Sequence, residues 1–97
     1  MIVTIEGNRS CSKTTQAYKL IGCNNFIVLN GYEIDSPWFL KNVNKHIDYI
    51  LIDECNKKQY NKAFEFFNKK RITIKSPYGD EATFNTPIVI LIKQSLD

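Results

Sequence analysis

The sequence is poor in the residues that build small metal sites and disulfide frameworks. It contains three cysteines and one histidine in 97 residues, and no two cysteines have the spacing Cys-x-x-Cys. A structural zinc site needs about four such ligands, and an odd number of widely spaced thiols is typical of reduced cytosolic proteins. The sequence therefore predicts neither a zinc site nor a disulfide scaffold.

Long apolar runs and a signal peptide are also lacking. No stretch approaches the roughly 20 apolar residues that span a bilayer, and no charged start leads into a short apolar segment with a cleavage site. The net charge is only +3, from 13 basic and 10 acidic residues, which is compatible with nucleic acid without indicating it. We expect no membrane partner, a cytoplasmic location, and one domain over residues 1–97, since no repeat or linker interrupts the chain.

Short apolar runs alternate with helical patterns along the chain. Several of the runs are apolar on both faces, as in the strands of a parallel sheet covered by helices. The order predicts an α/β fold with a central, mostly parallel sheet flanked by helices and a β-hairpin before the last strand. The predicted strands are 2–5, 26–29, 47–53, 71–75, 82–84 and 88–92, and the predicted helices are 13–21, 36–43 and 57–68.

The segment GNRSCSKT, Gly7–Thr14, matches the phosphate-binding pattern G-x-x-x-x-G-K-[ST] except at the last glycine. It lies between a predicted strand and a predicted helix, where backbone N–H groups and the helix dipole face a phosphate. Lys13 would then bind the β- and γ-phosphates as a catalytic cation, and the Thr14 hydroxyl would be a ligand of Mg²⁺. The predicted nucleotide-binding residues are Gly7, Asn8, Arg9, Ser10, Cys11, Ser12, Lys13, Thr14 and Thr15.

Ser12 stands at the position of the missing glycine. Glycine suits this position because the backbone approaches the phosphates closely and can need a positive φ, which costs serine of order 1 kcal/mol. Serine is small, and its hydroxyl can donate to a phosphate oxygen. We expect weaker nucleotide affinity rather than its loss; the alternative for the whole segment is a plain strand-to-helix turn.

Two carboxylates follow an apolar strand in the middle of the chain. Asp53 and Glu54 come directly after Tyr49–Ile52. Ligands gather at the carboxyl ends of the strands of open parallel sheets, so these residues should lie beside the phosphate-binding segment. Asp53 would hold Mg²⁺ with its water, and Glu54 would orient or deprotonate an attacking water. The alternative is a solvated acidic strand end.

Two family resemblances follow from these motifs. The opening Ile5–Gln16 resembles that of thymidylate kinases, which implies a small nucleotide kinase. The Asp-Arg pair and the arginine-rich lid of that family are missing, since the two arginines are Arg9 and Arg71.

A longer ordered set resembles the P-loop ATPase domain of superfamily 3 helicases, particularly the replication-initiator (Rep) proteins of small circular single-stranded DNA viruses and related plasmids. It comprises the phosphate loop, the acidic pair, a hairpin over Ile72–Phe84 similar to motif B′, and the last strand, Pro87–Ser95. The resemblance implies a minimal P-loop NTPase that uses ATP and Mg²⁺ in DNA replication of a phage, virus or plasmid, in the host cytoplasm. Lys75 and Tyr78 would contact single-stranded DNA.

The polar sensor that contacts the γ-phosphate in this family is usually asparagine. Here the candidates are Lys93, Gln94 and Ser95. No arginine finger is assignable, and neither a nicking nuclease domain nor the helical oligomerisation collar is recognisable, so formation of a homo-oligomer stays open. A third alternative is a non-enzymatic, degenerate P-loop module that binds DNA or a host protein.

Overall fold

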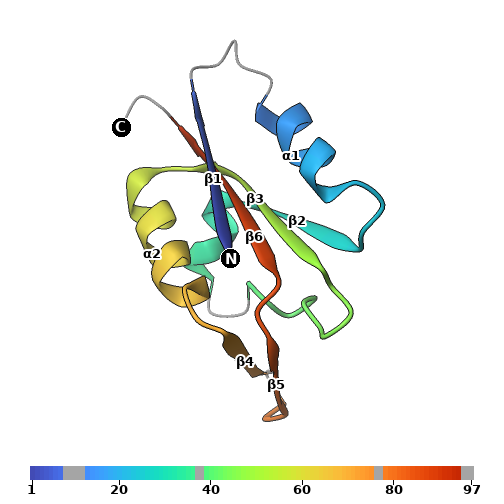
Figure 1. Ribbon diagram of the computed structural model, residues 1–97. Helices are drawn as coiled ribbons and strands as arrows, with labels where there is room; N and C mark the ends of the chain where they lie inside the picture. Colours follow the sequence, from blue (N-terminus) through green and yellow to red (C-terminus); the bar gives the residue numbers. More distant parts are fainter. Residues whose placement is uncertain (8–12, 37–38, 76–77, 95–97) are drawn as a thin grey trace.

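The computed structural model describes residues 1–7, 13–36, 39–75 and 78–94 (Figure 1). Its elements are β1 (Ile2–Gly7), α1 (Lys13–Ile21), β2 (Phe26–Asn30), the 3₁₀ helix η1 (Gly31–Asp35), β3 (Tyr49–Cys55), α2 (Lys57–Phe67), β4 (Arg71–Lys75), β5 (Glu81–Asn85) and β6 (Ile88–Gln94). In the described residues, no helix is both long and apolar enough to cross a membrane.

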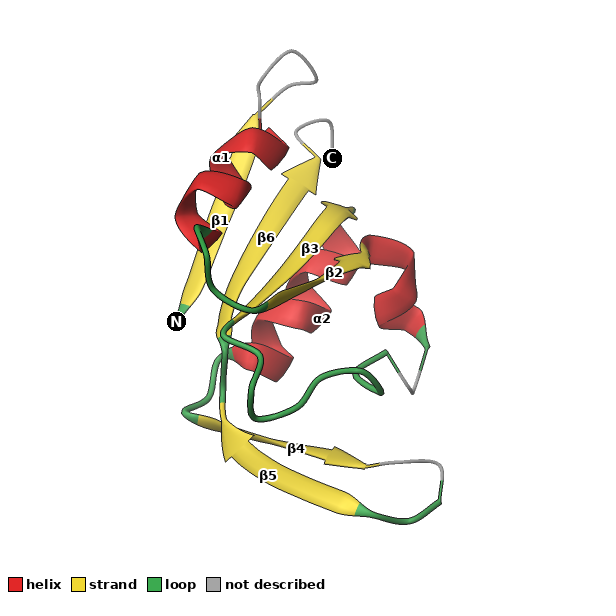
Figure 2. Ribbon diagram, turned by 90° about the vertical axis from the view of Figure 1, so that its right-hand side faces the viewer, coloured by secondary structure: helices red, strands yellow, loops and turns green. Residues whose placement is uncertain are grey.

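Four strands form a parallel sheet in the order β1-β6-β3-β2. The last strand of the chain, β6, is therefore inserted between β1 and β3. Because all four strands run the same way, they end at one side of the sheet, which we call the carboxyl end (Figure 2). The predicted α/β class with a parallel sheet and flanking helices is confirmed.

The two α-helices cover opposite faces of the sheet, which explains why its strands are apolar on both faces. On the α1 face, Ala17 and Ile21 pack with Ile5, Leu51, Ile90 and Ile92. On the α2 face, Ala63 and Phe67 belong to a larger cluster that includes Leu29, Ile50, Ile52, Val89 and Leu91. Burying each such Leu or Ile stabilises the fold by about 1.5–3 kcal/mol.

Helix α1 ends where the sequence predicts. Gly22 follows the helix with φ +60°, the left-handed conformation that glycine adopts without steric cost. Its N–H donates to the carbonyl of Tyr18, and the side-chain amide of Asn24 donates to the carbonyl of Ile21. The last turn is thereby capped, and the chain turns directly into β2.

Helix α2 begins with a capping box. The Asn56 side chain accepts from the backbone N–H of Gln59, and the Gln59 side chain accepts from that of Asn56. The helical spacing of Tyr60, Ala63, Phe64 and Phe67 predicts that these four face the core. The prediction is only partly correct, because Phe64 is 39% exposed while Ala63 and Phe67 are buried.

The helix predicted over residues 36–43 is wrong. The described residues there form turns, with the Val43 N–H donating to the carbonyl of Leu40, and the regular element is instead η1, just before them. This connection returns from the carboxyl end of β2 to the start of β3, and its contacts with the core override the local helical preference. Leu40 and Val43 reach the core from the turns.

The predicted hairpin before the last strand is present. Strands β4 and β5 pair antiparallel, with Arg71 opposite Asn85 and Lys75 opposite Glu81, as a two-stranded sheet of their own. Figure 2 shows this hairpin at the opposite end of the molecule from the carboxyl end of the sheet.

Candidate functional site

The predicted nucleotide site lies at the carboxyl end of the sheet. Gly7 is in register with Gln94, and Asp53 is in register with Asn30. Adjacent strands are about 4.8 Å apart, so the ends of β1 and β3, which flank β6, are separated by about 10 Å. Three segments far apart in sequence therefore meet here, each with a predicted site residue.

The start of α1 lies at the same end of the sheet. Lys13 is the first residue of α1 and is half-buried, while Thr14 and Thr15 are exposed. Tyr49 and Leu51 contact the α1 cluster, and side chains alternate along a strand, so Asp53 lies on the α1 face as well. The predicted residues Asn8, Arg9, Ser10, Cys11 and Ser12 lie outside the described residues, as does Ser95.

Asp53 and Glu54 form a β-bulge, which the sequence did not predict. Ile52 pairs with Leu91 and Cys55 with Lys93, so two residues of β3 oppose one of β6. The backbone N–H of Glu54 donates to Asp53 Oδ1 at 2.8 Å. Bulges of this kind re-aim side chains and are frequent beside functional sites.

Glu54 is in the left-handed conformation, with φ +58°; no other non-glycine residue of the described chain has a positive φ. This conformation costs an ordinary residue roughly 1–2 kcal/mol, and such strain persists where the surrounding structure imposes it. The bulge leaves the Glu54 side chain exposed and turns the next side chain, Cys55, back into the α2-face core.

Gly31 holds the bulge from the side of β2. A Cβ at Gly31 would lie 2.5 Å from the Glu54 carbonyl oxygen and 2.7 Å from Gln59 Oε1. Only glycine allows the backbones to approach this closely. Gln59 also donates to Asp35 Oδ2, and Lys62 Nζ donates to the carbonyl of Ile34, so η1 and the start of α2 are joined around the bulge. In the sequence, the pair Asn30-Gly31 indicates only a turn, and the position of Gly31 directly after β2 is the one signal for its role.

Cys55, next to the acidic pair, is a buried neutral thiol. Burial, assisted by the negative charge of Asp53, raises the pKa of Cys55 from its ordinary value of 9.0 to about 11. Its Sγ lies 3.9 Å from the carbonyl of Ile52, as a weak donor. A thiol in this state is a poor nucleophile and a poor metal ligand.

Lys93 and Gln94, two of the predicted sensor residues, are successive residues of β6, where alternate residues belong to opposite faces of the sheet. Lys93 Nζ lies 5.1 Å from the centroid of the Tyr60 ring, a cation–π contact on the α2 face, and the Tyr60 hydroxyl is 2.9 Å from Thr4 Oγ1. Lys93 is thus directed away from the face that carries Asp53. Gln94, whose backbone is in register with Gly7, is the remaining described candidate.

The predicted DNA contacts, Lys75 and Tyr78, are on the hairpin. Tyr78 is 92% exposed. Lys75 Nζ lies 3.4 Å from Glu81 Oε1, and both side chains are largely exposed. An exposed ion pair of this kind contributes only about 0–1 kcal/mol, so Lys75 can exchange its partner for a phosphate at little cost.

Among the described residues there is no cluster of three or more His, Cys, Asp or Glu side chains that could hold a metal ion by itself. Magnesium in nucleotide sites takes one or two protein oxygens and completes its shell with phosphates and water. The Thr14 hydroxyl and the Asp53 carboxylate supply hard oxygen donors of that type. They fit a metal that arrives with the nucleotide rather than a resident ion.

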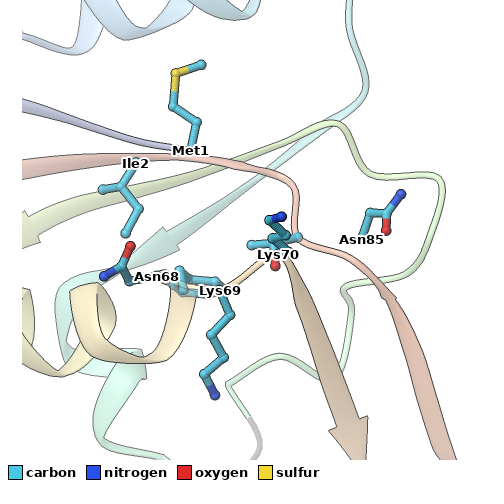
Figure 3. A pocket seen from close by; sticks show the side chains of 8 residues that line it. Met1, Ile2, Asn68, Lys69, Lys70 and Asn85 are labelled. Carbon is cyan, nitrogen blue, oxygen red and sulfur yellow. The ribbon is translucent and has the colours of Figure 1, made fainter.

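A cavity of about 510 Å³ opens elsewhere, beside the start of β1. Figure 3 shows its lining, with Lys70 near its centre and Lys69 directed away from Met1. The C-terminus of α2 ends beside it at Phe67, where the helix dipole is negative.

Neither a scan against protein-family models nor a search of curated proteins finds a match for this sequence.

Proposed function

We propose that this protein is an ATP- and Mg²⁺-binding P-loop ATPase domain that acts in DNA replication as a superfamily 3 helicase-like module of phage, viral or plasmid type. The observation that carries the proposal is the strand order β1-β6-β3-β2. In this parallel sheet, Gly7 and Lys13, which bound the predicted phosphate-binding segment, lie at the same end as the acidic pair on β3. The two motifs are 39 residues or more apart in the sequence, and only the general behaviour of parallel sheets predicted that they lie close together.

Each residue has a role that follows from its position. Lys13, at the N-terminus of α1, adds its charge to the helix dipole and binds the β- and γ-phosphates. The hydroxyl of Thr14 and the carboxylate of Asp53 hold the metal, whose charge offsets that of the phosphates. The gap of about 10 Å between β1 and β3 leaves room for phosphates and metal above the end of β6.

Glu54 is the proposed general base. Its left-handed backbone and exposed side chain set it apart from Asp53, whose Oδ1 accepts from the Glu54 N–H. The Asp53 carboxylate is thus held beside the metal by a backbone hydrogen bond, while the exposed Glu54 carboxylate can reach a water. Separate environments for two neighbouring carboxylates are what a division between metal binding and proton transfer requires.

The experiment is an ATPase assay with and without single-stranded DNA, comparing the wild type with Glu54→Gln. We expect DNA-stimulated turnover in the wild type and a loss of about 100-fold or more in the variant, the usual contribution of a general base. ATP binding should persist in the variant, because Lys13, Thr14 and Asp53 are unchanged. Glu65→Gln, an exposed change of the same type on α2, is the matched control.

Two results would contradict the proposal. Phosphate transfer to a nucleoside monophosphate, rather than to water, would indicate a nucleotide kinase. Failure of the wild type to bind Mg²⁺–ATP would indicate a non-enzymatic module that keeps the strand–loop–helix unit as a scaffold.

A further inference from the structure

We propose that two copies of this chain form a two-fold symmetric dimer in which β2 of one copy pairs antiparallel with β2 of the other. Strand β2 is an edge of the parallel sheet and, among the described strands, pairs with β3 alone (Figure 1). An exposed strand edge is a template for another extended strand. Pairing about a two-fold axis uses the same surface of both copies, so the assembly closes at two.

The backbone of β2 presents four hydrogen-bonding groups along this edge. The Asn25 carbonyl accepts from the N–H of the first residue of β3. Successive residues of a strand direct their backbone groups to opposite sides, so Phe26 and Val28 direct N–H and C=O away from β3, where no described strand pairs with them. The next outward N–H, that of Asn30, donates to Glu33 Oε2 at 2.6 Å. The unpaired edge therefore consists of Phe26 and Val28.

One antiparallel register pairs all four of these groups. With Phe26 of one copy opposite Val28 of the other, each such pair exchanges two N–H···O bonds. Ile27 then lies on the two-fold axis, opposite Ile27 of the other copy. Each Phe26–Val28 pair also joins an aromatic and a β-branched side chain, a favourable cross-strand combination. The edge is thus complementary to itself.

The side chains beside this edge are apolar and partly uncovered. The buried residues that pack with α1 belong to β1, β3 and β6, so α1 covers β2 only through Tyr18, whose ring meets that of Phe26 edge to face with centroids 5.6 Å apart. Tyr18 is 44%, Phe26 38% and Val28 48% exposed. Pairing of the two β2 strands joins these patches across the axis and removes apolar surface from water.

Strand β2 lacks the features that protect sheet edges from pairing. Charged side chains, prolines and bulges are the usual protections. Residues 26–30 include no charge and no proline, and the register with β3 runs without a bulge. The other edge strand, β1, carries the exposed Glu6. Pairing of β2 with β2 is therefore better supported than pairing of β2 with β1.

The charges that flank β2 are complementary between two copies. Lys19 follows Tyr18 near the start of β2, and Glu33 lies at the end of β2, where it accepts from Asn30. Antiparallel pairing brings Lys19 of one copy and Glu33 of the other to the same end of the paired strands. Asp48, a further acid there, lies on the β3 side, with Oδ2 accepting from the Asn25 N–H.

The proposed dimer contact contains no residue of the proposed ATP site. The inference therefore goes beyond the ATPase proposal and does not depend on nucleotide binding. A five-residue strand with one apolar patch gives a small interface, below about 1,200 Å² in total, which is typical of weak complexes. We expect a dimer that dissociates on dilution.

The test is sedimentation equilibrium of the full chain at about 1–500 μM, a range that covers weak association. We expect monomer at the low end, dimer at the high end and no larger species. Val28→Lys places a charge on the edge and should lower the association constant at least about tenfold. Its urea midpoint should stay unchanged, because Val28 is half exposed.

The matched control is Leu20→Lys. Leu20 is 50% exposed and lies two residues from Tyr18, about 200° around α1, on the side away from β2. This variant introduces the same charge in place of an equally exposed apolar residue. It should dimerise like the wild type.

A cysteine on the two-fold axis tests the register. The two Ile27 residues form a non-hydrogen-bonded pair with Cα atoms about 4.5 Å apart, within the range that a disulfide bridges. In a Cys11→Ser/Cys23→Ser background, in which Cys55 is buried, mild oxidation of Ile27→Cys should give a covalent dimer. Glu65→Cys, an exposed change on α2, controls for random collision and should give little.

Four results would overturn the inference. A wild type that is monomeric at every concentration would leave the edge to a strand of another protein, and species larger than a dimer would show a contact that does not close. Equal association of Val28→Lys and Leu20→Lys would exclude β2 from the contact. Cross-linking of Ile27→Cys no greater than that of Glu65→Cys would exclude the register. Mg²⁺–ATP binding, measured on the same samples, separates failure of the dimer from failure of the ATPase proposal.

Discussion

The backbone N–H of Glu54 donates to Oδ1 of Asp53 at 2.8 Å, inside a bulge that gives Glu54 a φ of +58°. This contact gives different environments to two neighbouring carboxylates for which the sequence predicts different roles. The Asp53 carboxylate accepts from the backbone, and the Glu54 side chain is left exposed.

The left-handed backbone of Glu54 predicts that a glycine at this position makes the protein more stable and less active. Glu54→Gly relieves the left-handed conformation and should raise the free energy of unfolding by about 1 kcal/mol, while abolishing ATP hydrolysis. Glu54→Ala keeps a Cβ and should not gain this stability. Urea unfolding of the three proteins measures the effect; equal stability of the glycine and alanine variants would contradict it.

Gly31 supports the bulge, so Gly31→Ala should destabilise the protein. Its Cβ would lie 2.5 Å from the Glu54 carbonyl oxygen, and forced overpacking of this kind typically costs about 1–3 kcal/mol. Adding Gln59→Ala removes the second close neighbour but not the backbone contact. The double variant should therefore keep the loss of stability caused by contact with the Glu54 carbonyl. A return to wild-type stability in urea unfolding would show that only the Gln59 side chain excludes a Cβ at Gly31.

Variants of Lys13 and of Asp53 should have different effects, because Lys13 is proposed to bind phosphate and Asp53 to bind the metal. Lys13→Met should weaken Mg²⁺–ATP binding at least about tenfold, as expected for a lost charge-assisted contact. Asp53→Asn should remove most of the difference between ATP binding with and without Mg²⁺. Isothermal titration calorimetry checks both, with Lys19→Met, an exposed change at the other end of α1, as control. Equal effects of Lys13→Met and Lys19→Met would refute the assignment.

The raised pKa of Cys55 predicts that the free energy of unfolding falls at alkaline pH. Its pKa is raised to about 11 in the folded protein, so between its ordinary value of 9.0 and about 11 the folded state holds a proton that the unfolded chain releases. The contribution of Cys55 is complete below pH 9 and is lost as the pH rises through this window. Cys55→Ala lacks this component, and its free energy of unfolding should fall less steeply from pH 9 to 11 than that of the wild type. Parallel curves would contradict the prediction.

Thiol labelling gives a second test of the same residue. In the native protein, Cys23 is exposed and Cys55 is buried. In a Cys11→Ser background, a thiol reagent should therefore modify Cys23 rapidly and Cys55 only on unfolding. Rapid modification of two thiols would show that β3 opens at the bulge.

Most of the regular elements could be predicted from local pattern. The β-branched and apolar runs at Ile2–Ile5 and Ile88–Ile92 form strands because such residues suit a sheet buried on both faces. The helix that starts at Lys13 ends before Gly22, because that glycine takes a positive φ without cost. The exception is the described part of the segment 36–43, where the packing of Leu40 and Val43 into the core, rather than local preference, decided the structure.

The sequence by itself determined which residues carry the candidate chemistry, namely the phosphate-binding segment and the acidic pair, because residue type and spacing are local properties. Only the tertiary structure decided how they meet. Insertion of β6 between β1 and β3 depends on pairing between distant strands, and it directs Lys93 toward Tyr60. The bulge at Glu54 depends on the close approach of Gly31, which follows a different strand. Such contacts join residues far apart in the chain, so no local pattern contains them.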